Sequence, residues 1–292
     1  MLTLMAWLSR RSLGSLHLLG TWIGWVGYLA SPTYRARFNA NADLASLSSA
    51  DRRAAIAHAG RMVVETPRLW LRPTDVPLVP KVEWADAQLV DAALQAGRGI
   101  VLLTPHQGAF EVTAQAYAER FGARQPVTAL YRPAKKAWLR ELEATARTRP
   151  GMLTAPATLA GVRTMIRALR QGQTVGLLPD QVPPEGMGVW APFFGRPAYT
   201  MTLAAKLALQ TGAPVLLMIG ERLPRAAGWR IRVFEPPEPL PALAAFAGDE
   251  VAHQTECAAV MNRAMEFLIR QCPAQYLWGY HRYKAPRSAN SS

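Results

Sequence analysis

The sequence has few of the residues and motifs on which several common enzyme chemistries depend. Its 292 residues include two cysteines, Cys257 and Cys272, and no C-x-x-C pair or metal-type spacing. Both fall in one predicted C-terminal helix, which places them roughly 22 Å apart and beyond disulfide reach. There is also no G-x-S-x-G nucleophile motif. We therefore expect no disulfide, no metal and no cofactor, and the cysteine content fits a reducing compartment.

Acidic residues are also scarce, since 20 Asp and Glu stand against 33 Lys and Arg, for a net charge of +13. Such an excess predicts an anionic partner: nucleic acid, a membrane surface, or an acidic protein or substrate. Basic and acidic residues are interleaved and no known nucleic-acid-binding module is present, so a membrane-tethered nucleic-acid-binding protein ranks below an enzyme. Arg163, Arg167 and Arg170 share one face of a predicted helix, which we interpret as solvated.

Residues 13–31 are 19 consecutive uncharged positions that include Trp22, Trp25 and Tyr28. A helix of this length spans about 30 Å, the thickness of a bilayer core. A cleaved signal peptide and a helix lying on the membrane surface are the competing interpretations, and four glycines and His17 weaken the case for spanning. We predict an uncleaved anchor or a monotopic hairpin. The predicted domains are a membrane anchor at 1–37 and a single domain at 38–292.

The most informative stretch is 99–111, where an apolar strand pattern gives way to an alanine-rich helical pattern. The strand ends just before His106 and the helix begins near Ala109. Ligands and reacting groups of α/β folds commonly lie at such strand-to-helix turns. We predict that Glu111, in the first helical turn, reaches one nitrogen of His106 and leaves the other to accept a proton.

Two more predicted strands end beside polar residues. The strand at 126–131 is followed by Arg132, and the strand at 174–178 by Asp180. The carboxyl ends of parallel strands meet at one edge of a sheet, so Arg132 and Asp180 are expected near His106. This convergence is the main argument from the residues for a single site.

The whole pattern predicts an α/β fold with a mixed, largely parallel central sheet flanked by helices, preceded by the N-terminal hydrophobic membrane-anchoring helix. The proline- and glycine-rich stretch at 182–197 is predicted to be a long loop whose aromatics bind an apolar ligand or pack beneath it. Further strands are expected at 214–219 and 229–234, and helices at 51–70, 85–95, 109–120, 158–170, 200–210 and 249–271.

Four blocks occur in a specific order: His106-Gln107-Gly108-Ala109-Phe110-Glu111; Tyr131-Arg132-Pro133; Pro179-Asp180-Gln181 with Pro192-Phe193-Phe194-Gly195; and Gln275-Tyr276-Leu277-Trp278 through Lys284. Together they resemble the bacterial lipid A biosynthesis (lauroyl/myristoyl) acyltransferases, within the lysophospholipid acyltransferase superfamily. The resemblance covers about residues 1–284. The family's first block more often reads H-F-G-N-W-E, and its P-E-Q-Y-L-W has Ala274 in place of the glutamate here.

The resemblance implies an O-acyltransferase that moves a fatty acyl chain from an acyl-carrier-protein thioester to a hydroxyl of a lipid A precursor, late in lipopolysaccharide biosynthesis. It implies a bacterial inner-membrane location with the catalytic domain on the cytoplasmic face. His106 is the expected general base and Glu111 its support. The candidate substrate-binding residues are Arg132, whose forked donors suit a phosphate, Asp180, which orders the site or contacts sugar atoms, Gly108, whose surrounding amides suit an oxyanion, and Gly195.

Two further alternatives remain open. The same chemistry acting on a lysophospholipid or another glycolipid acceptor is the nearest. A hydrolase, in which the same pair of residues activates water, is less favoured. The acyl chain length depends on the depth of a pocket that the residues do not reveal, and the sequence does not indicate an oligomeric state.

Overall fold

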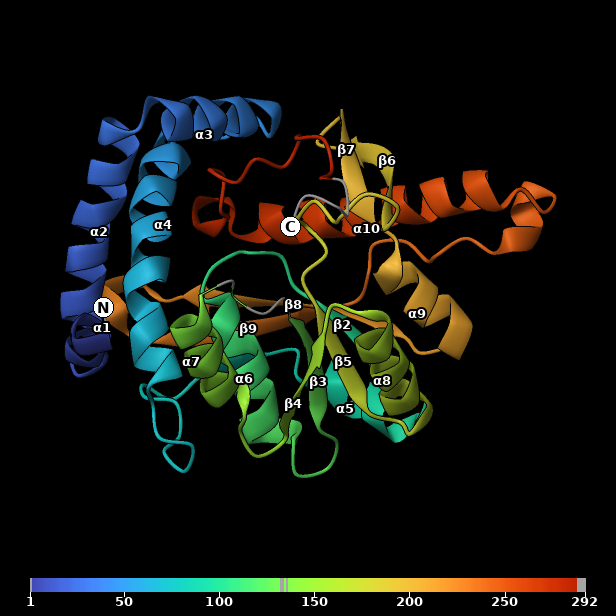
Figure 1. Cartoon of the computed structure of the whole chain (residues 1–292), viewed down its shortest axis with the longest axis horizontal. Helices are drawn as coiled ribbons and strands as arrows, with labels where there is room; N and C mark the ends of the chain where they lie inside the picture. The colour runs from blue at the N-terminus through green and yellow to red at the C-terminus, as the bar shows by residue number, and fades with distance from the viewer. Residues whose placement is uncertain (1, 132–133, 135, 288–292) are drawn as a thin grey trace.

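A seven-stranded sheet forms the centre of the molecule, and a two-stranded hairpin lies apart from it (Figure 1). The computed structural model describes residues 2–131, 134 and 136–287. The strands of the large sheet are ordered β1-β9-β8-β2-β5-β3-β4, and β6 pairs with β7. The bounds are β1 Glu83–Ala85, β2 Ile100–Leu103, β3 Val127–Tyr131, β4 Met152–Pro156, β5 Thr174–Leu177, β6 Gly188–Phe193, β7 Arg196–Met201, β8 Val215–Arg222 and β9 Trp229–Phe234.

Helices precede and connect these strands. The α-helices are α1 Leu2–Ser9, α2 Leu13–Ala30, α3 Pro32–Leu44, α4 Ser49–Trp70, α5 Gln88–Gln95, α6 Phe110–Phe121, α7 Ala137–Arg147, α8 Leu159–Arg170, α9 Leu203–Thr211 and α10 Glu250–Gln271. Short 3-10 helices are η1 Pro224–Ala226, η2 Leu243–Phe246 and η3 Pro273–Gln275.

The large sheet is mostly parallel. Every neighbouring pair of its strands runs parallel except β8 and β9, which are antiparallel. Parallel neighbours require crossover connections, which helices such as α6 and α8 supply between strands. The predicted α/β fold with a mixed, largely parallel sheet flanked by helices is therefore confirmed.

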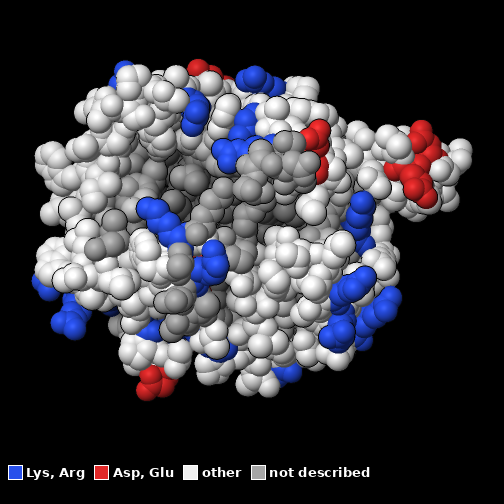
Figure 2. Space-filling model, viewed as in Figure 1, with Lys and Arg blue, Asp and Glu red and all other residues white. Residues whose placement is uncertain are grey.

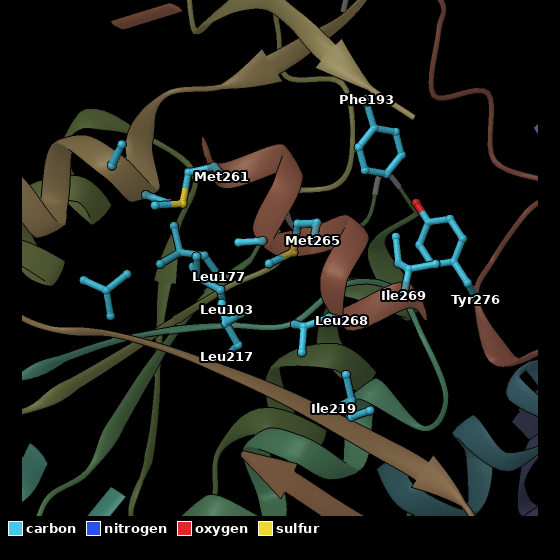
Figure 3. Close-up of a cluster of buried hydrophobic side chains, with 14 of the residues drawn as sticks. Leu103, Leu177, Phe193, Leu217, Ile219, Met261, Met265, Leu268, Ile269 and Tyr276 are labelled. Atoms are coloured by element: carbon cyan, nitrogen blue, oxygen red, sulfur yellow. The ribbon is translucent and has the colours of Figure 1, made fainter. Parts of the chain in front are cut away.

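Both faces of the sheet are covered, because alternate residues of a strand point to opposite faces. In β2, Ile100 and Leu102 pack with α5 and α6, whereas Val101 and Leu103 pack with α8, α9 and α10. A strand buried on both sides needs no polar face, which explains the unbroken apolar run of β2. Figure 3 shows the second cluster, in which sheet residues lie beside α10: Leu103, Leu177, Leu217, Met261, Met265 and Leu268.

The predicted N-terminal helix exists as α2, and it lies along α4 (Figure 1). Gly20 and Gly60 allow this close packing, because a Cβ on Gly60 would collide with the Gly20 carbonyl oxygen. The opposite side of α2 is exposed and apolar, with large side chains three or four residues apart: Leu18, Trp22, Val26 and Leu29. Among the described residues, no helix has both the length and the apolarity needed to cross a membrane.

The predicted loop at 182–197 is wrong in its second half, which forms the β6–β7 hairpin. The strands pair from Gly188 with Met201 to Phe193 with Arg196. Pro192 and Pro197 lie opposite each other, and they obscure the strand pattern in the sequence. Each strand of a two-stranded ribbon is an edge strand, where proline is tolerated.

Candidate functional site

Two strand ends bring His106 and Asp180 into contact. His106 lies in the turn between β2 and α6, and Asp180 lies just after β5, the neighbour of β2. The His106 Nδ1 is 2.7 Å from Asp180 Oδ1, and the His106 backbone N–H donates to Asp180 Oδ2 at 2.9 Å. The predicted convergence of these two strand ends is therefore observed, whereas Arg132, the third residue of that prediction, lies outside the described residues.

The contacts of the imidazole define its tautomer. A carboxylate only accepts hydrogen bonds, so the contact with Asp180 requires the proton on Nδ1 of neutral His106. The other nitrogen, Nε2, lies 3.1 Å from the side-chain nitrogen of Gln181, from which it accepts. The side chain of His106 is 19% exposed. The lone pair on Nε2 is thus held at the open side of the ring, where a general base needs it.

Asp180 is buried and charged. Burial by itself raises the pKa of its carboxyl, but the charge of His106, the two hydrogen bonds from His106 and the charge of Arg282 outweigh this effect, so the pKa lies below its ordinary value. Arg282 is itself buried, and it donates to the Tyr199 carbonyl at 2.7 Å and to Thr200 Oγ1 at 2.8 Å. Asp180 therefore contacts the imidazole directly, and of the two roles that the sequence predicts for it, ordering the site is the one that fits this contact.

Glu111 lies in the first turn of α6, and it lines the same cavity as His106. Its Oε2 accepts a hydrogen bond from the indole N–H of Trp70 at 3.1 Å. The residue whose carboxylate contacts Nδ1 of His106 is Asp180, whereas the sequence predicts Glu111 at one of the ring nitrogens. The signal for Asp180 was available in its position after β5, but sequence spacing does not show which carboxylate comes closer.

A largely apolar cavity of about 420 Å³ opens in front of His106. Its lining includes residues of both α6 and α8, and two of the lining residues, Leu159 and Met187, are 75% and 52% exposed. Other residues that line it include Leu102, Ala114, Ala129, Met152, Gly176, Gln181 and Met218. An acyl chain is the kind of ligand that such a wall binds by apolar burial.

Gly108 is required by packing. Its φ is +56°, and a Cβ at this position would collide with the carbonyl oxygen of Gly220. Its N–H donates to the Gln275 carbonyl at 2.8 Å, and the N–H of Ala109 donates to Gly220 at 2.7 Å. Both of these amides are therefore used within the protein, and an oxyanion site formed by other amides around Gly108 stays a prediction.

Gly195 lies in the turn that connects β6 to β7. Its φ is +74°, a conformation that favours glycine, and a Cβ there would meet no atom within 4 Å. Gly195 is absent from the described lining of the cavity. The structure thus gives this glycine a role in the hairpin turn.

The C-terminal segment holds the turn that carries His106. The backbone N–H of Leu277 donates to the His106 carbonyl at 3.1 Å, and the Gln107 side chain donates to the carbonyls of Ile269 and Cys272. Tyr280 accepts from the backbone N–H of Val182, two residues after Asp180. These contacts explain why the last sequence block belongs with the site, which the residues alone did not show.

A buried ionic network links the N-terminal helices to the same turn. Glu65 on α4 pairs with His17 on α2 and, through Oε2 at 2.7 Å, with Nε of Arg222 at the end of β8. The Gln275 side chain accepts from the Arg222 N–H and donates to its carbonyl. Gln275 also supplies the carbonyl that Gly108 uses. In the described part of the chain, no three His, Cys, Asp or Glu side chains form a group suited to a metal ion.

Comparison with known proteins identifies the family. The family model described as bacterial lipid A biosynthesis acyltransferase matches residues 3–285. The chain is 28% identical over 226 residues to a lipid A biosynthesis lauroyltransferase of Escherichia coli (strain K12), covering 77% of this chain and 69% of the relative. It is 28% identical over 239 residues to a lipid A biosynthesis palmitoleoyltransferase of the same strain and to a lipid A biosynthesis acyltransferase of Shigella flexneri, covering 80% of this chain and 71% of each relative. The family match extends over nearly the whole chain, so the protein belongs to the bacterial lipid A biosynthesis acyltransferases.

Proposed function

We propose that this acyltransferase moves a fatty acyl chain from an acyl-carrier-protein thioester to a hydroxyl group of a lipid A precursor, with His106 as the general base. One observation carries the proposal. The imidazole is fixed at Nδ1 by a buried carboxylate, while Nε2 lies beside an apolar cavity large enough for an acyl chain. The printed names of the relatives, a lauroyltransferase and a palmitoleoyltransferase, support a fatty acyl group as the one transferred.

The reaction begins when the acceptor hydroxyl replaces the Gln181 amide as the hydrogen-bond partner of Nε2. The hydroxyl oxygen attacks the thioester carbonyl carbon as its proton passes to Nε2. Removal of the proton is needed because a neutral alcohol is a poor nucleophile. The resulting tetrahedral intermediate collapses with cleavage of the carbon–sulfur bond. The imidazolium returns the proton to the departing thiolate, so the products are an ester and the free thiol of the carrier.

Two carboxylates assist His106 in different ways. Asp180 keeps the proton on Nδ1 and stabilises the imidazolium once it forms, as the acid of a hydrolase triad does. Glu111 lines the same cavity as His106, and its negative charge would favour the same imidazolium. Its bond from Trp70 fixes the carboxylate between α4 and α6. Arg132 remains a proposed phosphate-binding residue on the strength of its position after β3.

Residues 1–37 are proposed as the membrane anchor and 38–292 as the acyltransferase domain. The exposed apolar stripe of α2 supports binding in the interfacial layer of the inner membrane, with the catalytic domain on the cytoplasmic face. A lipid acceptor would then reach the cavity without leaving the membrane surface. An acyltransferase of the same chemistry acting on a lysophospholipid or another glycolipid remains the alternative.

A transfer assay with an acyl-carrier-protein thioester and a lipid A precursor tests the proposal. His106→Ala should lower kcat about 10²- to 10⁴-fold, the usual contribution of a positioned general base. His253→Ala, a change at a histidine on α10 that is absent from the described lining of the cavity, is the matched control and should leave kcat unchanged. A normal kcat for His106→Ala would show that His106 is not the general base. Release of free fatty acid without acceptor would indicate a hydrolase, and transfer only to lysophospholipid would establish the alternative acceptor.

A further inference from the structure

The solvent-facing side of α8 carries three exposed arginines, Arg163, Arg167 and Arg170. Their spacing of four and three residues keeps them within about 60° of one another around the helix and spreads them over about 10 Å along its axis. We call this set the arginine row. Within the part of the chain that the structure describes, none of the three has an ion-pair or hydrogen-bond partner on its side chain.

The arginine row is held on a rigid support. The opposite face of α8 buries Met165, Ala168 and Leu169 in the core below the sheet. The helix begins at the side-chain cap of Thr158, which accepts from the N–H of Gly161. A Cβ on Gly161 would collide with the Pro156 carbonyl, so α8 lies directly against the end of β4. The arginines therefore form a fixed pattern of charge.

The arginine row leads to the open end of the cavity. Thr158, Leu159 and Val162, in and just before the first turn of α8, line the cavity, and Arg163 is the next residue. Leu159 is a large apolar side chain exposed at the opening. A partner placed on α8 would thus have one end beside the entrance that an acyl chain must pass.

The charge of this region is of one sign. Figure 2 shows a group of basic side chains over the place where α8 and α9 lie in Figure 1, and on the face shown no acidic side chain lies among them. Lys206, on α9, is exposed as well, and α9 packs beside α8. Salt bridges within the described chain neutralise other exposed arginines, such as Arg230 by Glu83 and Arg263 by Glu238.

We propose that the arginine row is the docking surface for the acyl-carrier protein, and that it binds an acidic helix of this partner beside the cavity entrance. The inference rests on the proposed function, since it requires the donor to be carried by an acidic protein. Carboxylates spaced three or four residues apart on a partner helix match the arginine spacing. Charge pairs at the rim of an interface mainly accelerate and orient encounter, and salt weakens them.

The experiment compares two double charge reversals in the full-length protein. Arg163→Glu with Arg167→Glu changes the row, and Arg53→Glu with Arg225→Glu changes the net charge equally at two exposed arginines elsewhere. Transfer is measured with acyl-carrier protein as the donor and with an acyl-pantetheine thioester, which has no protein part. Arg163→Gln with Arg167→Gln is the milder variant, and thermal unfolding shows that each variant is folded.

We expect the reversal in the row to raise KM for the acyl-carrier protein about tenfold at low salt, with kcat and the acyl-pantetheine rate unchanged. The difference should shrink as salt rises, and the control pair should match the wild type. Equal KM values for the row and control variants would overturn the docking surface. Loss of binding to anionic vesicles with an unchanged KM for the carrier would assign the row to a membrane instead. A wild type that accepts no carrier-bound acyl group would reject the proposed function itself.

Discussion

Asp180 receives two hydrogen bonds from one residue, since both the ring and the backbone N–H of His106 donate to its carboxylate. The two bonds use different oxygens, Oδ1 for the ring and Oδ2 for the backbone. Rotation of the imidazole about its side-chain bonds would therefore cost a charge-assisted hydrogen bond in a buried setting. The pair fixes the direction in which Nε2 points.

Asp180→Asn should leave the fold intact and lower kcat about 10²- to 10⁴-fold, the scale of general-base catalysis. The backbone N–H of His106 can only donate, so the asparagine oxygen will turn toward it and the amide NH₂ will face Nδ1. That contact places the proton of His106 on Nε2, where it blocks proton acceptance. Steady-state kinetics gives kcat, and circular dichroism checks the fold. A kcat within twofold of wild type would show that Asp180 does not select the tautomer.

Gly108→Ala should destabilise the protein by about 3 kcal/mol, the sum of a left-handed backbone penalty and overpacking against Gly220. Gly195→Ala is the matched control, because its φ is also positive but space is open around it. Its cost should be about 1 kcal/mol. Urea unfolding measures both. Equal losses in the two variants would mean that the contact with Gly220 adds nothing.

Glu65→Gln should lower the free energy of unfolding at pH 7 by about 3–5 kcal/mol, because it leaves the Arg222 guanidinium buried without its countercharge. Burial raises the pKa of the Glu65 carboxyl, but Arg222 and the bond from His17 outweigh burial and lower it below the ordinary 4.5. The stabilisation is thus fully present above pH 4.5 and is lost as the pH falls through the lower folded-state pKa. Urea unfolding from pH 7 to pH 3 should show the gap between wild type and variant closing. A gap independent of pH would contradict this account.

Gly176→Leu should shift the donor preference toward shorter acyl chains. Gly176 lines the cavity, and a Cβ there would contact only Val127, at 3.6 Å, so the rest of the new side chain extends into free space. Each methylene that the cavity can no longer bury costs about 0.8 kcal/mol, so losing two should reduce kcat/KM for the longest accepted chain about tenfold. Ala123→Leu, on the surface after α6, is the control. Competition among thioesters of several acyl lengths measures the shift. An unchanged order of preference would show that the acyl chain does not bind in the part of the cavity beside Gly176.

Periodicity and strand order predicted most of what positions the site. The pattern predicted β9 to its terminal residues, and it predicted α4, α6, α8 and α10 within two residues at each end. Each of these elements has a strong repeat of apolar residues, and burial of these residues determines where the element begins and ends in the sequence. The convergence of His106 and Asp180 followed from two apolar strands of similar length, each ending before a polar residue.

Other features depend on contacts between distant residues, which spacing does not encode. Met152–Pro156 forms the edge strand β4, whose mixture of apolar and polar residues does not identify it without β3 beside it. The choice of Asp180 for Nδ1 depends on side-chain geometry within the sheet edge. Gln275 carries no signal for its bonds to Gly108 and Arg222, because its partners lie more than 50 residues away in the sequence.

The hydrogen bonds from Gly108 to Gln275 and from Leu277 to His106 also set an order of events during synthesis. The strand and helix on either side of His106 are made early, but Gln275 and Leu277, which complete this turn, are translated much later. A nascent chain that has not reached that stage lacks them. The turn therefore becomes complete only once Gln275 and Leu277 have been translated, and a chain cut short before Gln275 would retain the strands of the sheet without the contacts that hold the turn around His106.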